Sequence, residues 1–243
     1  MSQVSSATAN AARLNTNTSP TASVPDHLTV RFTNVSDMRA VTALFERERK
    51  SKMDPTGKVR ARSAQELFGP VSSGSALIAV DPSDNIRFFG MSSDHYSVAS
   101  GAVGVTELGG IMCDLPGFKV AQLGSAMLAL NEAIRLREEN PCFSSRGVHA
   151  LVARNNGPAN KIFGRELAWQ DIAEDDAREQ LFVTQNKHSC VKARGERIWY
   201  EFGESARDKA RDVITNPLAQ GYLSARSGHR IPVTLDTRTH SLV

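Results

Sequence analysis

A glycine-containing loop that runs into a helix is the stretch of this sequence best suited to chemistry. Residues 114–126 read Asp-Leu-Pro-Gly-Phe-Lys-Val-Ala-Gln-Leu-Gly-Ser-Ala. The segment continues with apolar residues at spacings of four, three and four, which place them on one helix face: Leu123, Met127, Leu130 and Ile134. A helix N-terminus offers unpaired N–H groups and the positive end of the helix dipole. The stretch therefore predicts a binding site for phosphate oxygens.

Two glycines interrupt the strand-like run that precedes this loop. Residues 106–113 read Thr-Glu-Leu-Gly-Gly-Ile-Met-Cys. Glycine inside a strand usually marks a bulge, or a place where another group comes close to the backbone. We expect a kink at Gly109–Gly110, just before the phosphate-binding loop.

These segments together resemble the GNAT superfamily of acyl-CoA-dependent N-acyltransferases. Residues 121–126, Ala-Gln-Leu-Gly-Ser-Ala, are similar to the family's pyrophosphate-binding motif Arg/Gln-x-x-Gly-x-Gly/Ala. Residues 152–169 resemble its second signature, in which an Asn is followed by an Ala, an aliphatic-aromatic pair and Leu-Gly-Phe. The shared order of strand, loop, helix, strand and helix covers the middle third of the chain.

The sequence departs from the family pattern at three places. Ala121 stands where the loop motif has Arg or Gln, although Gln122 is adjacent. Phe163 stands where many members carry a Tyr that protonates the leaving thiolate. Ala168–Trp169 replaces Gly-Phe. The resemblance therefore points more firmly to cofactor binding than to a general acid.

The resemblance implies acetyl-CoA as co-substrate, with its pantetheine arm lying like an extra strand between two strands splayed by a bulge. Backbone amides would hold the pyrophosphate and polarise the thioester carbonyl. The expected cofactor contacts are Ile111, Met112, Cys113, Lys119, Val120, Ala121, Gln122, Leu123, Gly124, Ser125, Ala126, Asn156, Asn160 and Phe163. The alternatives are a glycine-rich strand and turn packed in an ordinary core and, at Asn156, a simple helix entry.

Two residues are candidates for proton transfer. Glu107 precedes the kink on the strand where GNAT proteins often carry a Glu that acts through water, and we take it as the catalytic base. Its alternative is a side chain that points to solvent from the other face of the strand. Tyr96 is the candidate acid, with a surface residue as its alternative.

Composition limits the other classes of function. The chain has 243 residues, 40% of them hydrophobic and 23% charged, as is usual for a globular protein. Its net charge of +3 is too small to indicate nucleic-acid binding, and no apolar run approaches the roughly 20 residues of a membrane span. The three cysteines are scattered, without metal-ligand spacing, so we expect no metal and a reducing, cytoplasmic setting.

The resemblance implies an α+β fold with a GNAT-like mixed, mostly antiparallel central sheet flanked by helices. The expected elements are a strand at 28–32, a helix capped by Ser36–Asp37 and continuing to about Lys50, a short helix after the Ser63–Glu66 capping box, a hairpin of 76–80 and 86–90, the strands and helices of the two motifs, strands at 170–173 and 181–184, and a helix at 204–214.

We divide the chain into a disordered tail (1–26), a GNAT-like acyltransferase domain (27–188) and a C-terminal extension (189–243) that could pack on the core, form a homodimer contact or bind a partner. The expected function is transfer of an acetyl group to an amine of a protein or small molecule by direct attack in a ternary complex. The alternatives are a catalytically weak acyl-CoA-binding adaptor or regulator, and a secreted or phage-borne modifier of a host protein.

Overall fold

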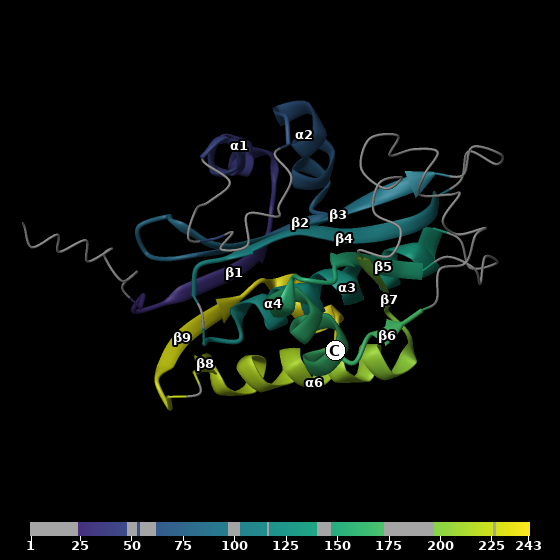
Figure 1. Cartoon of the computed structure of the whole chain (residues 1–243). Helices are drawn as coiled ribbons and strands as arrows, with labels where there is room; N and C mark the ends of the chain where they lie inside the picture. The colour runs from purple at the N-terminus through teal and green to yellow at the C-terminus, as the bar shows by residue number, and fades with distance from the viewer. Residues whose placement is uncertain are drawn as a thin grey trace, which may run out of the picture.

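The computed structural model describes residues 24–47, 53, 62–96, 103–115, 117–139, 147–172, 197–225 and 227–243. A twisted sheet runs through the middle of the molecule (Figure 1). Helices α1 and α2 lie on one face of the sheet, and α3, α4 and α6 lie on the other (Figure 1). The expected α+β class is confirmed.

The sheet holds nine strands within the described residues, in the order β6-β7-β5-β4-β3-β2-β1-β9-β8. Their bounds are β1 Leu28–Phe32, β2 Ala76–Val80, β3 Ile86–Tyr96, β4 Val103–Cys113, β5 Gly147–Ala153, β6 Gln170–Asp171, β7 Arg197–Glu201, β8 Tyr222–Ser224 and β9 Arg230–Leu235. Two of the pairings are parallel, β4 with β5 and β1 with β9, and the others are antiparallel. The sheet is thus mixed and mostly antiparallel, as the resemblance implies.

The helices lie on the two faces of this sheet (Figure 1). They are α1 Met38–Glu46, α2 Ala64–Ser73, α3 Val120–Glu139, α4 Gly157–Asn160 with a π-helical turn over Lys161–Glu166, and α6 Glu204–Gln220. The predicted capping box of α2 is present, because the Ser63 hydroxyl accepts from the Glu66 amide while the Glu66 carboxylate accepts from the Ser63 amide.

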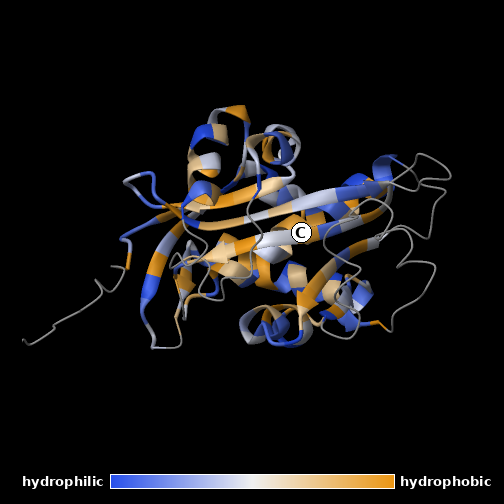
Figure 2. Ribbon diagram, turned by 45° about the horizontal axis from the view of Figure 1, so that its top comes forward, coloured by the Kyte–Doolittle hydropathy of each residue, from blue (hydrophilic) through white to orange (hydrophobic). Residues whose placement is uncertain are grey.

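Helix α3 is the most deeply buried helix of this part of the chain. It lies between the sheet and α6, so nearly all of its first three turns are buried. Gly124 and Leu128 lie against the sheet, whereas Leu123 of the four-three-four stripe lies on the side that faces α6. Figure 2 shows the central strands and the helix beneath them as largely hydrophobic. One apolar cluster occupies this face, and a smaller one joins α1 and α2 to the opposite face.

Several predicted boundaries were wrong. The first helix is preceded by a 3-10 turn over Val35–Asp37 that is capped by Asn34, and α1 ends at Glu46, short of the expected Lys50. Strand β3 runs six residues past Gly90 to Tyr96. Helix α6 continues past Ile214 to Gln220. The expected strand 181–184, residues 1–23 of the tail and residues 189–196 at the start of the extension lie outside the described residues.

The C-terminal segment adds to the sheet at two places. Strand β7 lies between β5 and β6, so the sheet continues across the predicted domain boundary at residue 188. Helix α6 then crosses beneath α3, and the hairpin of β8 and β9 joins the far side of β1. The chain after β9 is fixed by Asp236, whose carboxylate accepts from the Phe32 amide at 3.1 Å. Neither strand was predicted from the sequence, because β8 has only three residues and Pro232 interrupts the strand pattern of β9.

Gly124 is where α3 comes closest to the sheet. A Cβ at this position would lie 2.3 Å from the ring of Phe88, which is itself fully buried. The glycine of the supposed loop motif therefore has a packing reason that is independent of any ligand.

We expect Gly124→Ala to lower the free energy of unfolding by about 2 kcal/mol, because the added methyl overpacks a rigid contact despite the higher helix propensity of alanine. Denaturant unfolding would measure the change. Gly157→Ala is the matched control, since a Cβ there meets nothing within 4 Å, and it should change stability by less than about 0.5 kcal/mol. Equal effects of the two substitutions would contradict the packing argument.

Candidate functional site

The expected kink in β4 is a β-bulge. Met91 pairs with Gly109 and Phe89 pairs with Met112, so β4 has one residue more than β3 over this interval. Gly110 accommodates the extra residue with a φ of 63°, a left-handed conformation that is strained for residues with a side chain. The sequence-based prediction of a bulge is confirmed.

Strands β4 and β5 separate at this bulge. They pair in parallel over three positions only, Val105–Glu107 with Gly147–His149. Beyond His149, β5 pairs with β7 on its other side, and β4 beyond Gly109 pairs with β3. The facing edges of β4 and β5 therefore have no ladder pairing with each other toward the carboxyl end of β4, and we call this unpaired interval the opening.

Helix α3 begins at this same end of the sheet. The exit of β4 is fixed by Arg87, which donates to the carboxylates of Asp114 at 2.8 Å and Asp81 at 3.2 Å. Gly117 and Lys119 are exposed, and the first bond of the helix runs from the Leu123 amide to the Lys119 carbonyl at 2.9 Å. The amides of the first turn before Leu123 therefore lack carbonyl partners within the helix.

The expectation of a binding loop that extends through Ala126 needs correction. Leu123, Gly124, Ser125 and Ala126 lie inside α3 and are fully buried, and the amides from Leu123 onward belong to the helix. Of the expected anion-binding stretch, only Lys119–Gln122 lies at the helix N-terminus. The helix therefore begins at Val120, before the six residues 121–126 that resemble the family motif.

Gln122 is a buried polar side chain in the first turn of α3. It is 6% exposed, and its amide nitrogen donates to the Glu166 carbonyl at 3.3 Å. Its side-chain oxygen is buried and has no hydrogen-bond partner among the described residues. A buried acceptor of this kind is rare in proteins.

Cys113, an expected cofactor contact, is already engaged by its surroundings. Its backbone amide donates to the Met53 carbonyl at 2.8 Å. Burial raises the pKa of its thiol to about 11, although the backbone amides of Leu115 and Ala121 act in the opposite direction. The neutral thiol therefore lies against the first turn of α3. Ile111 is half-buried on the α3 face, and Met112 is buried against the α1–α2 cluster.

Glu107 pairs with a histidine. Its carboxylate lies 3.0 Å from Nε2 of His95 on β3, and the two side chains are 22% and 8% exposed. The Glu107 carboxylate also extends alongside Gly109, because a Cβ there would lie 3.6 Å from Oε1. The acid–base candidate is thus at the bulge, and the long-range partner His95 could not be identified from sequence spacing.

A polar row crosses the sheet beside this pair. Ser93, Glu107, His149 and Glu201 are successive backbone partners on β3, β4, β5 and β7. The Trp199 indole N–H donates to Nδ1 of His149 at 2.7 Å, so a neutral His149 carries its proton on Nε2. A Cβ at Gly147 would lie 2.7 Å from that nitrogen and 3.4 Å from Glu201 Oε1.

The residues of the second motif have structural partners. Asn156 caps α4 by accepting from the Ala159 amide at 3.3 Å, as its alternative reading proposed. The Asn160 side chain donates to the carbonyls of Ala153 and Arg154, both at 3.0 Å. Phe163 is buried against Trp169, with ring centroids 4.8 Å apart. Their cofactor contacts stay predictions.

The two tyrosines of interest lie in different places. The backbone of Tyr96 pairs with Val103, about 20 Å along β4 from Gly109 at ~3.3 Å per residue, so the structure does not bring it to the bulge. Tyr200 is buried on β7, and its hydroxyl donates to Asn160 Oδ1 at 3.4 Å. Burial, with the nearby Asp171, raises the pKa of Tyr200, so its hydroxyl stays protonated at neutral pH.

Among the described residues, no cluster of three or more His, Cys, Asp or Glu side chains could hold a metal ion. In the same part of the chain, every helix is too short or too polar to cross a membrane.

Comparisons with known proteins find similarity at the level of structure. No protein-family model matches the chain, and no curated protein matches it. A GNAT-family acetyltransferase from Listeria monocytogenes has 12% identity and a TM-score of 0.44, covering 72% of this chain and 93% of its own. NAA60 of Arabidopsis thaliana, solved with acetyl-CoA, has 15% identity and a TM-score of 0.38, covering 60% and 88%. A GNAT-family acetyltransferase from Bacillus anthracis has 11% identity and a TM-score of 0.41, covering 73% and 95%.

The raised pKa of Cys113 predicts its reactivity. Alkylation requires the thiolate, so the rate at Cys113 should rise about tenfold per pH unit up to a midpoint near pH 11. Mass spectrometry of the Cys113 peptide after iodoacetamide treatment measures this alkylation rate. The measurement runs from pH 7 to about pH 10 and keeps to pH values at which the protein stays folded. Restricted access would slow the rate at every pH without moving the midpoint. A plateau at pH 9 would contradict the prediction.

Proposed function

We propose that this protein is an N-acyltransferase that moves an acetyl group from acetyl-CoA to the amine of a protein or small molecule. The observation that carries the proposal is the opening between β4 and β5 at the Gly110 bulge, next to the N-terminus of α3. A slot with unpaired strand edges and a helix N-terminus at its mouth suits a ligand with an extended amide arm and a diphosphate.

The diphosphate binds at the first turn of α3. The amides of Lys119–Gln122 have no carbonyl partner within the helix, and the helix dipole adds positive potential at the same place. The exposed Lys119 ammonium adds a full charge beside them. Because the Ala121 amide also faces the Cys113 sulfur, the remaining amides of the turn supply most of the contacts.

The pantetheine arm lies in the opening as an additional strand. Its amides bond to the facing edges of β4 and β5, as in other cases of strand addition. This places the thioester at the bulge, where backbone amides near Ile111 polarise the carbonyl oxygen and stabilise the oxyanion that develops. Cys113 does not take part in this step through its amide, which donates to Met53.

The acceptor amine approaches from the side of Glu107 and His95. Its nitrogen forms a bond to the thioester carbon, the C–S bond breaks, and the CoA thiolate leaves and takes up a proton. Glu107 accepts the proton that the amine loses, directly or through one water, while His95 holds the carboxylate in place at 3.0 Å. The carboxylates of Glu107 and Glu201 on the polar row favour a cationic acceptor.

Removing the base should affect turnover and not cofactor affinity. We expect Glu107→Gln to lower kcat by about 10²–10³-fold, the usual contribution of a general base, and to leave the Kd for acetyl-CoA within twofold. Release of free thiol with a panel of amines measures kcat, and calorimetry measures Kd. Glu138→Gln, an exposed site near the end of α3, is the matched control and should match the wild type.

Two results would count against this assignment. Unchanged turnover of Glu107→Gln at every pH would remove Glu107 from the mechanism. Absence of acetyl-CoA binding to the wild type at near-millimolar ligand would end the acyltransferase proposal itself.

A further inference from the structure

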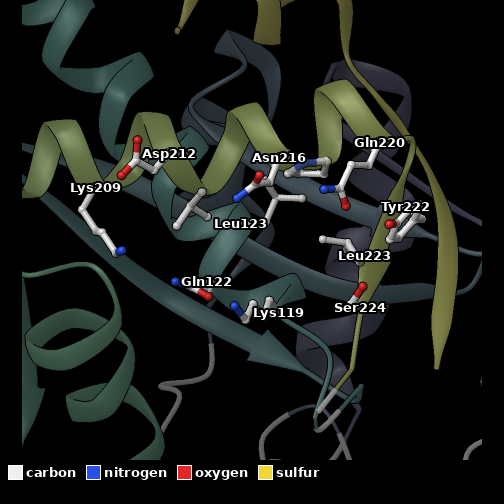
Figure 3. A pocket seen from close by; sticks show the side chains of 12 residues that line it. Lys119, Gln122, Leu123, Lys209, Asp212, Asn216, Gln220, Tyr222, Leu223 and Ser224 are labelled. Carbon is white, nitrogen blue, oxygen red and sulfur yellow. The ribbon is translucent and has the colours of Figure 1, made fainter. Parts of the chain in front are cut away.

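A cavity of about 300 Å³ lies between the first turn of α3 and the C-terminal segment (Figure 3). Lys119 and Gln122 line it from α3, Lys209, Asp212 and Asn216 from α6, and Ser224 from β8. The volume is at the lower end of the range for small-molecule sites, about 300–1,000 Å³, so it suits one nucleotide-sized group and not a whole coenzyme.

One wall of the cavity is built by residues outside the GNAT-like motifs. Helix α6 presents Lys209, Asp212 and Asn216 on one face, at spacings of three and four. Strand β8 is held against the entrance of α3 by a β-bridge between Phe118 and Ala225. The wall of the cavity is therefore fixed in place next to the proposed diphosphate site.

The lining has an excess of positive charge, and it includes a side-chain oxygen that accepts no hydrogen bond from the described residues. Lys119 and Lys209 are both exposed, and neither forms an ion pair with a described residue, while Asp212 is the one carboxylate of the lining. In Figure 3 the Lys209 side chain extends from α6 toward the start of α3, where Gln122 and Lys119 lie. The buried Gln122 oxygen, unpaired within the described chain, can accept from an amino group of a ligand.

We propose that this cavity binds the phosphorylated adenosine end of the acyl-CoA, with Lys209 at its 3′-phosphate. The inference rests on the proposed function, because the diphosphate at the first turn of α3 brings the adenosine to the cavity. The C-terminal segment is then part of the cofactor site, and it distinguishes CoA from analogues that lack the 3′-phosphate.

The test compares CoA with 3′-dephospho-CoA by calorimetry on the full chain. The wild type should bind CoA about five- to tenfold more tightly, the contribution of a single charge–phosphate contact at a partly exposed site. Lys209→Ala should weaken CoA by that factor, leave dephospho-CoA unchanged and so abolish the difference. Lys209→Arg should retain the preference, because it keeps the charge.

Arg211→Ala is the matched control. It removes one positive charge from the same helix outside the lining, where Arg211 pairs with Asp208 at 3.1 Å, and it should retain the wild-type preference. Equal weakening of both ligands by Lys209→Ala, or a preference that survives it, would overturn the cavity assignment while leaving the acyltransferase proposal intact. Failure of the wild type to bind either ligand would overturn both.

Discussion

One extra residue in β4 is the constraint on which the site depends. The left-handed backbone of Gly110 allows the bulge, and a residue with a side chain would be destabilised by roughly 1 kcal/mol or more in that conformation. Because β4 keeps its pairing with β3 on both sides of the bulge, the change in direction appears on its other edge, where β5 leaves. The opening and Glu107, which pairs with His95, lie within a few residues of this point, and α3 begins at Val120 at the same end of the sheet.

Local patterns predicted much of the fold. Alternation predicted β1, a hairpin pattern predicted β2, the Ser63–Glu66 capping box predicted the start of α2, and paired glycines predicted the bulge. These features are determined by neighbouring residues, so a single sequence reveals them. The glycine of the loop motif misled in one respect, because Gly124 also satisfies a close contact with Phe88, which sequence alone does not show.

Contacts between distant segments could not be predicted. His95 meets Glu107 across two strands, and Trp199 meets His149 across fifty positions of chain, so neither pair leaves a short-range signal. Strand β7 was assigned to an extension because the expected fold does not require a segment after residue 188, yet it lies between β5 and β6. The cavity wall from α6 and β8 depends on where those elements pack against α3. The amino-acid composition does not predict that packing.

The two edge strands of the described sheet have a consequence for self-association. Strand β6 has two residues and β8 has three, although the strands at the centre reach eleven. Short edge strands leave few unpaired backbone donors and acceptors, which is a common protection against unwanted strand pairing between molecules. Along these two borders, a second copy would find little backbone with which to continue the sheet, so a stable contact there would have to use side chains instead.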